Sequence, residues 1–257
     1  RIIKPETEFE TTSSIIIHTM GDSKGETITV GYWHIRGLAA PLRMMCSFKS
    51  AKWENKTYEL SAKEGGGWDA SSWFGKDKPE LKKKNPLINL PYVVHKGKVV
   101  TQTNAIFMYL AKELGLDGGD TTGCNQLLCE IMDLRNSSVK LFYGAKDEDA
   151  TASHLGSTVP KHFKKFEEWI SAKKSTYLLG EEPTVPDFHM WEMIDQHEIL
   201  ASANNKESLL KDYPGLAKLY TSLRGRAELK GYFEGELYKL PINNKMASFG
   251  AKYIAGK

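Results

Sequence analysis

Residues 27–38 read TITVGYWHIRGL, and this stretch sets the expectation for the fold. In its first half, apolar side chains occupy alternate positions: Ile28, Val30 and Tyr32. That alternation, in a β-rich segment, predicts a strand over 27–33. Beyond Gly37, apolar side chains recur at helical spacing instead: Leu38, Leu42, Met45 and Cys46. We therefore predict a helix after Gly37, so the chain opens with an α/β unit.

The residues up to 114 continue as short strands and helices. In chain order we predict a strand at 56–60, a long loop at 61–79, a short helix at 79–84, strands at 91–94 and 98–101, and a helix at 103–114. The last two strands form a hairpin with Gly97 in its turn. Gly115 ends the last helix as its C-cap. The order of elements indicates a mixed α/β domain.

Residues 115–123, GLDGGDTTG, are the best candidate for a linker. Helical patterns without a convincing strand follow it: 124–143, 158–174, 186–202 and 214–225. We therefore expect an N-terminal extension over 1–26, an α/β domain over 27–114, and a helical domain with a C-terminal tail over 124–257.

Composition excludes several classes of protein. A chain of 257 residues is long enough for one or two domains, and 40% apolar with 26% charged residues is ordinary for a soluble globular protein. The formal net charge of +3 is too balanced for a dedicated nucleic-acid binder. No run approaches 18 apolar residues, so we expect no membrane span.

The cysteine and histidine patterns narrow the kind of site. Three cysteines, none in a C-x-x-C pair, argue against a disulfide framework, a zinc ribbon and dithiol redox chemistry. So low a count fits a reducing compartment, and we expect a cytoplasmic protein. Because the sequence begins with Arg1, an organelle is the alternative if a targeting segment was removed upstream. The four histidines of the second half show no metal-ligand spacing, so we expect no metal: His154, His162, His189 and His197.

The segment GYWHIRGL at 31–38 resembles the opening of mu-class glutathione S-transferases. Four further stretches resemble the same class in the same order: NLPY at 89–92, TQTNAI at 101–106, TVPDF at 184–188 and KMA at 245–247. The long loop before Trp73 also resembles the insertion of that class. The resemblance covers about 27–257. It implies a thioredoxin-like N-terminal domain followed by an all-α domain.

The resemblance also implies an enzyme that ionises reduced glutathione at Tyr32 and conjugates the thiolate to soft electrophiles. Glutathione would be a co-substrate, with no metal or organic cofactor. Lowering a thiol pKa of about 8.5 by about two units takes about 2.7 kcal/mol, and one hydrogen bond to a charged group contributes about 1.5–3 kcal/mol. One hydroxyl, aided by the positive end of the helix after Gly37, is therefore sufficient. Outside its motif, Tyr32 is more simply interpreted as a strand residue that packs the core.

Further glutathione-binding residues follow from the resemblance. Leu90 would offer its backbone to the cysteinyl backbone of glutathione, as an added strand does. Pro91 suits a cis peptide bond, although an ordinary edge-strand proline is the alternative. We expect Thr103 to be the N-cap of a helix at 104–114, whose free N–H groups would bind the γ-glutamyl carboxylate; a simply capped helix is the plainer reading. The other implied contacts are Trp33, Leu38, Trp73, Lys76, Asn89 and Gln102.

Two of these contacts have qualifications. Lys78 is a rival to Lys76, because the stretch between Trp73 and Asn89 is about three residues longer than usual. Asp133 would reach glutathione across the interface of a two-fold homodimer. On periodicity alone, Asp133 is an exposed helix residue and Tyr143 a core one.

The resemblance places the electrophile against Ile35, Val139 and Tyr143, with Tyr143 as a general acid or hydrogen-bond donor. The sequence departs from the family at three positions: Ala70 stands for an arginine, Leu87 for an aromatic anchor of the dimer, and Asn243 for an aromatic residue of the tail. The alternative function is a structural or accessory subunit of a larger assembly contacted by residues 1–26. Thr184-x-x-Asp187 is a capping box and serves folding.

Overall fold

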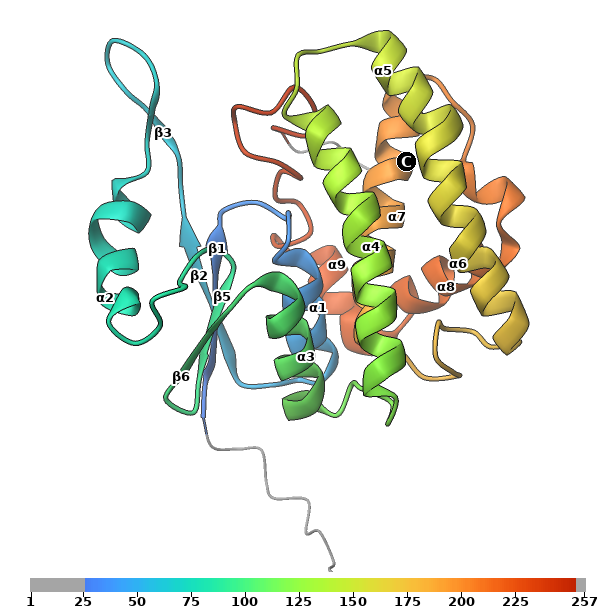
Figure 1. The fold of residues 1–257 in the computed structure, drawn as a ribbon, viewed down its shortest axis with the longest axis horizontal. Coiled ribbons are helices and arrows are strands. Elements are labelled where there is room, and N and C mark those ends of the chain that lie inside the picture. Colours follow the sequence, from blue (N-terminus) through green and yellow to red (C-terminus); the bar gives the residue numbers. More distant parts are fainter. Residues whose placement is uncertain (1–25, 253–257) are drawn as a thin grey trace, which may run out of the picture.

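The structure is a computed structural model that describes residues 26–252 (Figure 1). The proposed role of the N-terminal extension falls on residues 1–25, which lie outside the described residues, as do residues 253–257. Every helix within the described range is too short or too polar to cross a membrane.

The first half of the chain forms a four-stranded sheet in the order β2-β1-β5-β6. The strands are β1 (Ile28–Trp33), β2 (Trp53–Tyr58), β5 (Tyr92–His95) and β6 (Lys98–Thr101). β1 runs parallel to β2 and antiparallel to β5, and β5 and β6 form the predicted hairpin. The predicted second strand at 56–60 is displaced, because β2 pairs with β1 from Trp53 onward. β2 lies at the edge of the sheet, and it contains the exposed charged residues Glu54 and Lys56. It therefore lacks the alternating apolar residues that would identify it as a strand.

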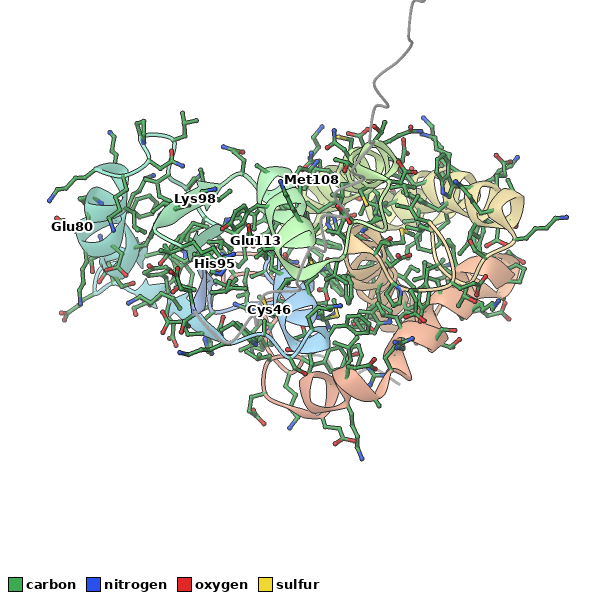
Figure 2. All side chains as sticks on the ribbon, turned by 90° about the horizontal axis from the view of Figure 1, so that it is seen from below. Cys46, Glu80, His95, Lys98, Met108 and Glu113 are labelled. Carbon is green, nitrogen blue, oxygen red and sulfur yellow. The ribbon has the colours of Figure 1, made fainter. Side chains whose placement is uncertain are left out.

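Helices cover both faces of this sheet. α1 (Ala40–Phe48) and α3 (Thr103–Leu114) lie on the side toward the rest of the molecule, and α2 (Lys78–Lys82) lies on the other side (Figure 1). Figure 2 shows this layering: His95 and Lys98 of the sheet lie between Glu80 of α2 and Cys46 of α1. α1 is almost completely buried, as expected of a helix between a sheet and a second layer of helices.

The prediction of one long loop over 61–79 is wrong in part. β3 (Ser61–Ala62) and β4 (Trp68–Asp69) form a small antiparallel hairpin, and a π-helical turn, η1 (Ser72–Asp77), leads into α2. Two residues on each strand are too few to give a periodic pattern. The turn between them contains three consecutive glycines with positive φ, Gly65–Gly67, which other residues rarely adopt.

The second half is helical among the described residues, as predicted. Its α-helices are α4 (Thr121–Phe142), α5 (Glu148–Ser153), α6 (Val159–Lys173), α7 (Val185–Ala203), α8 (Pro214–Arg224) and α9 (Lys230–Glu234), with shorter turns η2 (His154–Thr158), η3 (Leu209–Asp212) and η4 (Ala227–Leu229). α4 begins three residues before its predicted start, because the Asp120 side chain accepts the Gly123 N–H and caps it. α5 and α9 were not predicted, since six and five residues carry no clear periodicity.

α7 is the central helix, with 16 buried residues and contacts to α1, α3, α4 and α8. The capping box predicted at its start is confirmed. The Asp187 carboxylate accepts the Thr184 N–H, the Thr184 hydroxyl and the Leu178 N–H, each at 2.8 Å. All of these groups are buried, so no water can replace the carboxylate.

Replacing Asp187 with alanine should therefore destabilise the whole fold. Asp187→Ala leaves three buried donors without an acceptor, at about 1–3 kcal/mol each, and we expect a loss of about 3–5 kcal/mol in the free energy of unfolding. Denaturant unfolding followed by circular dichroism measures it. Asp149→Ala, at an exposed position in the first turn of α5, is the matched control and should stay within about 0.5 kcal/mol. A loss below about 1 kcal/mol for Asp187→Ala would contradict this account.

Candidate active site

The candidate site lies where the loop between β1 and α1 meets α4, α7 and the C-terminal tail. The tail approaches this loop through backbone hydrogen bonds: Arg36 N–H donates to Pro241 O at 2.7 Å, and Gly37 N–H donates to Ile242 O at 3.1 Å. Residues 35–38, which begin three positions after Tyr32, therefore lie between the α/β half and the helical half of the chain.

Tyr32 ends up beneath this loop, near the end of β1. It is 6% exposed, and its hydroxyl accepts a hydrogen bond from the backbone of Leu38. Gly37 has a φ of 39°, and a Cβ there would lie 2.7 Å from Tyr32 Cε1 and 3.0 Å from the hydroxyl oxygen, so only glycine fits. Burial raises the pKa of Tyr32, and the Arg135 guanidinium partly opposes that rise. The phenol thus stays protonated at neutral pH.

Two arginines that sequence reasoning missed fix the loop. The Arg36 guanidinium is buried, donates to both oxygens of Glu192 at 3.1 and 2.8 Å, and lies 2.6 Å from Asp195 Oδ2. Arg43 of α1 is also buried and donates to Ile35 O at 2.7 Å. Arg36 belongs to the quoted GYWHIRGL motif, and two acids three residues apart in the apolar α7 segment were the other available signal.

A second backbone element of the site is the turn before β5. The Leu90–Pro91 peptide bond is cis, as the resemblance implied. β5 lies between β1 and β6, so the alternative of an edge-strand proline is wrong. Thr101, another residue that the sequence analysis missed, holds this turn: its hydroxyl accepts the Asn89 N–H at 3.1 Å and lies 2.8 Å from Asn89 O.

The start of α3 differs from the prediction by one residue. Thr103 is the first helical residue, so its prediction as the N-cap is wrong; Gln102 occupies the N-cap, and no side chain caps the helix. Gln102 has a φ of 70°, a left-handed conformation that the sequence pattern does not reveal. The uncapped N–H groups at this end leave α3 able to bind a carboxylate.

Trp73 lies in an aromatic cluster on the α2 side of the sheet. Its indole stacks on Tyr92 with ring centroids 5.7 Å apart and is fully buried. The Trp73 Nε1 is buried and has no hydrogen-bond partner among the described residues. Lys78 lies 6.0 Å from the Trp73 ring, whereas its rival Lys76 is exposed.

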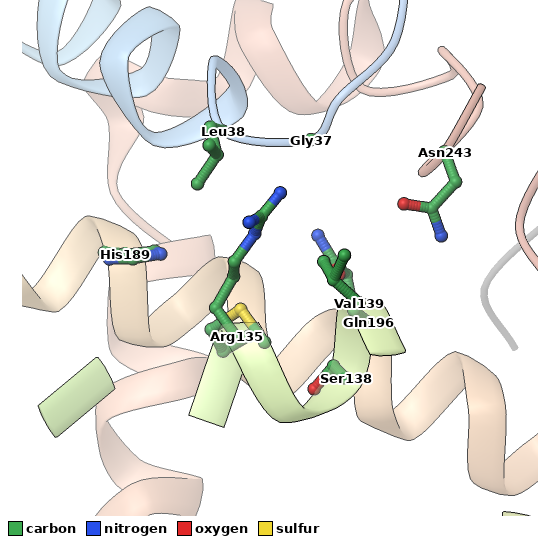
Figure 3. A pocket seen from close by; sticks show the side chains of 9 residues that line it. Gly37, Leu38, Arg135, Ser138, Val139, His189, Gln196 and Asn243 are labelled. Carbon is green, nitrogen blue, oxygen red and sulfur yellow. The ribbon is translucent and has the colours of Figure 1, made fainter. Parts of the chain in front are cut away.

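The predicted electrophile residues lie around the tail rather than in one pocket. Ile35 lines a cavity of about 140 Å³ between the β1–α1 loop, the end of β2 and the tail. Val139 lines a second cavity of about 10 Å³, drawn in Figure 3. Asn243 of the tail lines both cavities and is buried.

Tyr143 is the C-cap of α4 and is 37% exposed, so its assignment to the core is wrong. Its hydroxyl accepts the Asn244 N–H at 3.0 Å, which ties the tail to α4. Burial raises the pKa of Tyr143, so it also remains a protonated donor at neutral pH.

The predicted residues therefore differ in how they are held. Hydrogen bonds involve Tyr32, Leu38 and Tyr143, and Ile35 packs in the same core cluster as Tyr32. Trp73 belongs to a separate cluster, against which Leu90 and the half-buried Trp33 pack. The rings of Trp33 and Phe74 have centroids 6.4 Å apart. Pro91 and Thr103 are buried, whereas four predicted contacts are exposed at the surface: Lys76, Asn89, Gln102 and Asp133.

Both halves of the chain are similar to known proteins. The model of the glutathione S-transferase N-terminal domain matches residues 28–112, and that of the C-terminal domain matches residues 132–236. Glutathione S-transferase Mu 5 of Mus musculus is 29% identical over 233 residues, covering 89% of this chain and 98% of that protein. Glutathione S-transferase Mu 3 of Homo sapiens is 27% identical over 232 residues, covering 89% and 97%.

Solved structures share the fold. The pi-class glutathione S-transferase of Onchocerca volvulus superposes with a TM-score of 0.69 at 22% sequence identity, covering 86% of this chain and 99% of that one. The glutathione S-transferase Blo t 8 gives a TM-score of 0.70 at 20% identity, with the same coverage.

The bond between Tyr143 and the tail can be tested by proteolysis. Tyr143→Phe removes the acceptor of the Asn244 N–H, and a net loss of about 0.5–1.5 kcal/mol should open the tail about two- to tenfold more often. We expect trypsin to cleave after the exposed Lys245 faster by that factor, as measured by mass spectrometry. Tyr213→Phe, whose hydroxyl faces Pro160 O instead, is the control. Equal cleavage rates in wild type and Tyr143→Phe would disprove the contact.

Proposed function

Since the chain belongs to the glutathione S-transferase family, we propose that Tyr32 ionises reduced glutathione and that the thiolate is then conjugated to soft electrophiles. As a member of this family, the protein is a glutathione transferase, and glutathione is its co-substrate. One observation carries the assignment to Tyr32: its hydroxyl already accepts the Leu38 backbone hydrogen bond, so its own proton is free for the sulfur.

The protonation state of Tyr32 supports this role. Because burial raises its pKa, the phenol keeps its proton at neutral pH and acts as a donor rather than a base. Bound glutathione loses its S–H proton to solvent, and the thiolate accepts the Tyr32 O–H. A hydrogen bond to a charged acceptor contributes about 1.5–3 kcal/mol, which lowers a thiol pKa by about one to two units.

We assign the glutathione contacts by the same reasoning. The Leu90 backbone, held by the Thr101 hydroxyl through Asn89, would pair with the cysteinyl segment. The uncapped start of α3 at Gln102 and Thr103 would take the γ-glutamyl carboxylate. The unpartnered Trp73 Nε1 would donate to the glycine carboxylate. Around them, the assigned contacts are Trp33, Leu38, Asn89 and either Lys76 or Lys78.

The electrophile would lie against Ile35, Val139 and Tyr143. With an aryl halide, the thiolate sulfur forms a bond to the ring carbon, and the halide leaves with the electron pair. With an enone or an epoxide, negative charge develops on oxygen instead. Tyr143 can donate to that oxygen, because its bond with Asn244 uses the phenol as an acceptor and leaves its proton free.

We propose the domain division 27–114, linker 115–123 and 124–257 for the same chain. We also propose a reducing, cytoplasmic location, which the three free cysteines fit: Cys46, Cys124 and Cys129.

A homodimer would complete the site. Asp133 is exposed on α4, and among the described residues its carboxylate has no hydrogen-bond partner, which suits a role toward glutathione bound in a second subunit. Leu87 is 71% exposed in the segment before Ile88 and would be the apolar contact between subunits. It is a smaller anchor than an aromatic ring, so we expect a weaker dimer.

The role of Tyr32 is tested by Tyr32→Phe. We expect kcat/KM for conjugation of glutathione to 1-chloro-2,4-dinitrobenzene to fall about 10- to 150-fold. The pKa of the thiol of bound glutathione, measured from the thiolate absorbance as pH is raised, should increase by about one to two units. Tyr109→Phe is the matched control, because its hydroxyl bonds to His95 at the end of β5 away from Tyr32. Unchanged turnover in Tyr32→Phe would rule out the assignment. No conjugation and no glutathione binding by the wild type would favour the accessory-subunit alternative.

The dimer is tested by sedimentation. The wild type should sediment as a species with twice the mass of one chain. Leu87→Glu should raise the dissociation constant of the dimer by at least about tenfold, since burial of a leucine contributes about 1.5–3 kcal/mol. Leu87→Met, which keeps an apolar side chain, should remain dimeric. A monomeric wild type at all concentrations would refute the proposal.

A further inference from the structure

A small cavity between the two halves of the chain is lined by one cationic side chain, Arg135, together with neutral polar and apolar groups. It has about 10 Å³ of space, enough for one water-sized group, and its walls come from the β1–α1 loop, α4, α7 and the tail. Figure 3 shows the Arg135 side chain rising from α4 toward Gly37 and Leu38, with Asn243 on the other side. No aspartate or glutamate is among the nine residues that line it.

The Arg135 charge is not neutralised by the chain. Among the described residues it makes no ion pair, and its one hydrogen bond is a long contact of 3.4 Å to Asn136 Oδ1. The acids of α7 that face the same loop, Glu192 and Asp195, are bonded to Arg36 instead. Arg135 is half-buried, so its attraction for an anion is screened less than that of a surface arginine.

His189 gives independent evidence for a ligand site in this cavity. It lines the same space, is 1% exposed, and its Nδ1 is buried without a hydrogen-bond partner. A buried unpaired ring nitrogen is uncommon in a folded protein. Burial, with Arg135 nearby, lowers the pKa of His189 to about 3, so the ring is neutral and can present one N–H.

The cavity adjoins the reacting groups of the proposed function. Its wall includes Leu38, whose backbone is hydrogen-bonded to the Tyr32 hydroxyl. Arg135, Val139 and Tyr143 follow one another at four-residue spacing, so they share one face of α4. The guanidinium acts electrostatically on both phenols, lowering the pKa of Tyr32 and of Tyr143 against the effect of burial.

Resting on the proposed transferase function, we propose that Arg135 forms an anion subsite within the electrophile pocket, and that this enzyme prefers acceptors that carry a carboxylate. The carboxylate would bond to the half-buried guanidinium at the edge of the small cavity, whose own space admits one water-sized group, while the rest of the acceptor extends toward Val139 and Tyr143. Arginine suits this role because its planar fork binds both carboxylate oxygens.

The test compares two acceptors of the same shape, 4-chloro-3-nitrobenzoate and 4-chloro-3-nitrobenzamide. In both, glutathione sulfur bonds to the ring carbon, chloride leaves with the electron pair of the C–Cl bond, and the thiol proton passes to solvent. Each kcat/KM is divided by the uncatalysed rate constant, which removes the difference in intrinsic reactivity. We expect Arg135→Gln to lower the acid-to-amide ratio about 10- to 100-fold.

Lys140→Gln is the matched control. It removes one positive charge from the exposed side of the same helix and should leave the ratio within about twofold. If Arg135→Gln does not fold, as judged by thermal unfolding, Arg135→Met keeps the apolar stem and carries the same expectation.

A measurement without turnover separates this proposal from that for Tyr32. Calorimetric binding of 3-nitrobenzoate, which has no leaving group, should be tighter than that of 3-nitrobenzamide and should weaken about tenfold or more in Arg135→Gln. This result is expected even if Tyr32→Phe shows that Tyr32 is not the ionising residue. An unchanged acid-to-amide ratio in Arg135→Gln, an equal loss of rate with both acceptors, or the same change in Lys140→Gln would overturn the subsite.

Discussion

A buried guanidinium joins the two halves of the molecule. Arg36 lies in the loop after β1, and its carboxylate partners, Glu192 and Asp195, lie on α7 more than 150 residues later in the chain. Asp195 also accepts the hydroxyls of Tyr220 at 2.6 Å and Tyr238 at 3.1 Å. A buried charge is costly unless it is paired and hydrogen-bonded, and here Arg36 Nε and Nη2 both donate to these carboxylates. These contacts hold the loop against the helical half.

The position of the loop determines the chemistry around it. Because Arg36 is fixed, Gly37 closes over Tyr32 and the Leu38 backbone reaches the phenol. The N–H groups of Arg36 and Gly37 donate to Pro241 O and Ile242 O, so the same loop also positions the tail. Arg36 and Arg135 thus differ: Arg36 is neutralised by acids and holds the structure, whereas Arg135 makes no ion pair among the described residues.

Local periodicity predicted most of the fold. β1, β5, β6, α3 and the four long helices of the second half follow from alternation, helical spacing and glycine caps. The start of α3 was misplaced because Gln102 adopts a left-handed conformation that composition does not indicate. β3 and β4 were missed because their pairing is only two residues long. For the site, Tyr32 and the cis bond before Pro91 follow from short motifs, whereas Thr101, Arg43 and the Arg36 cluster depend on side chains that meet only after folding.

The tail is attached largely through backbone atoms. Pro241 and Ile242 contribute carbonyl groups, and Asn243 and Asn244 contribute N–H groups, to Gly250 O and the Tyr143 hydroxyl respectively. The Asn244 N–H contact persists when that side chain is exchanged, whereas the buried Asn243 side chain also donates to Phe249 O at 3.0 Å and helps to fix the path of the tail. Asn243 borders both cavities. Exchange of this one side chain would therefore change the walls of both cavities at once, while the glutathione half stays unchanged.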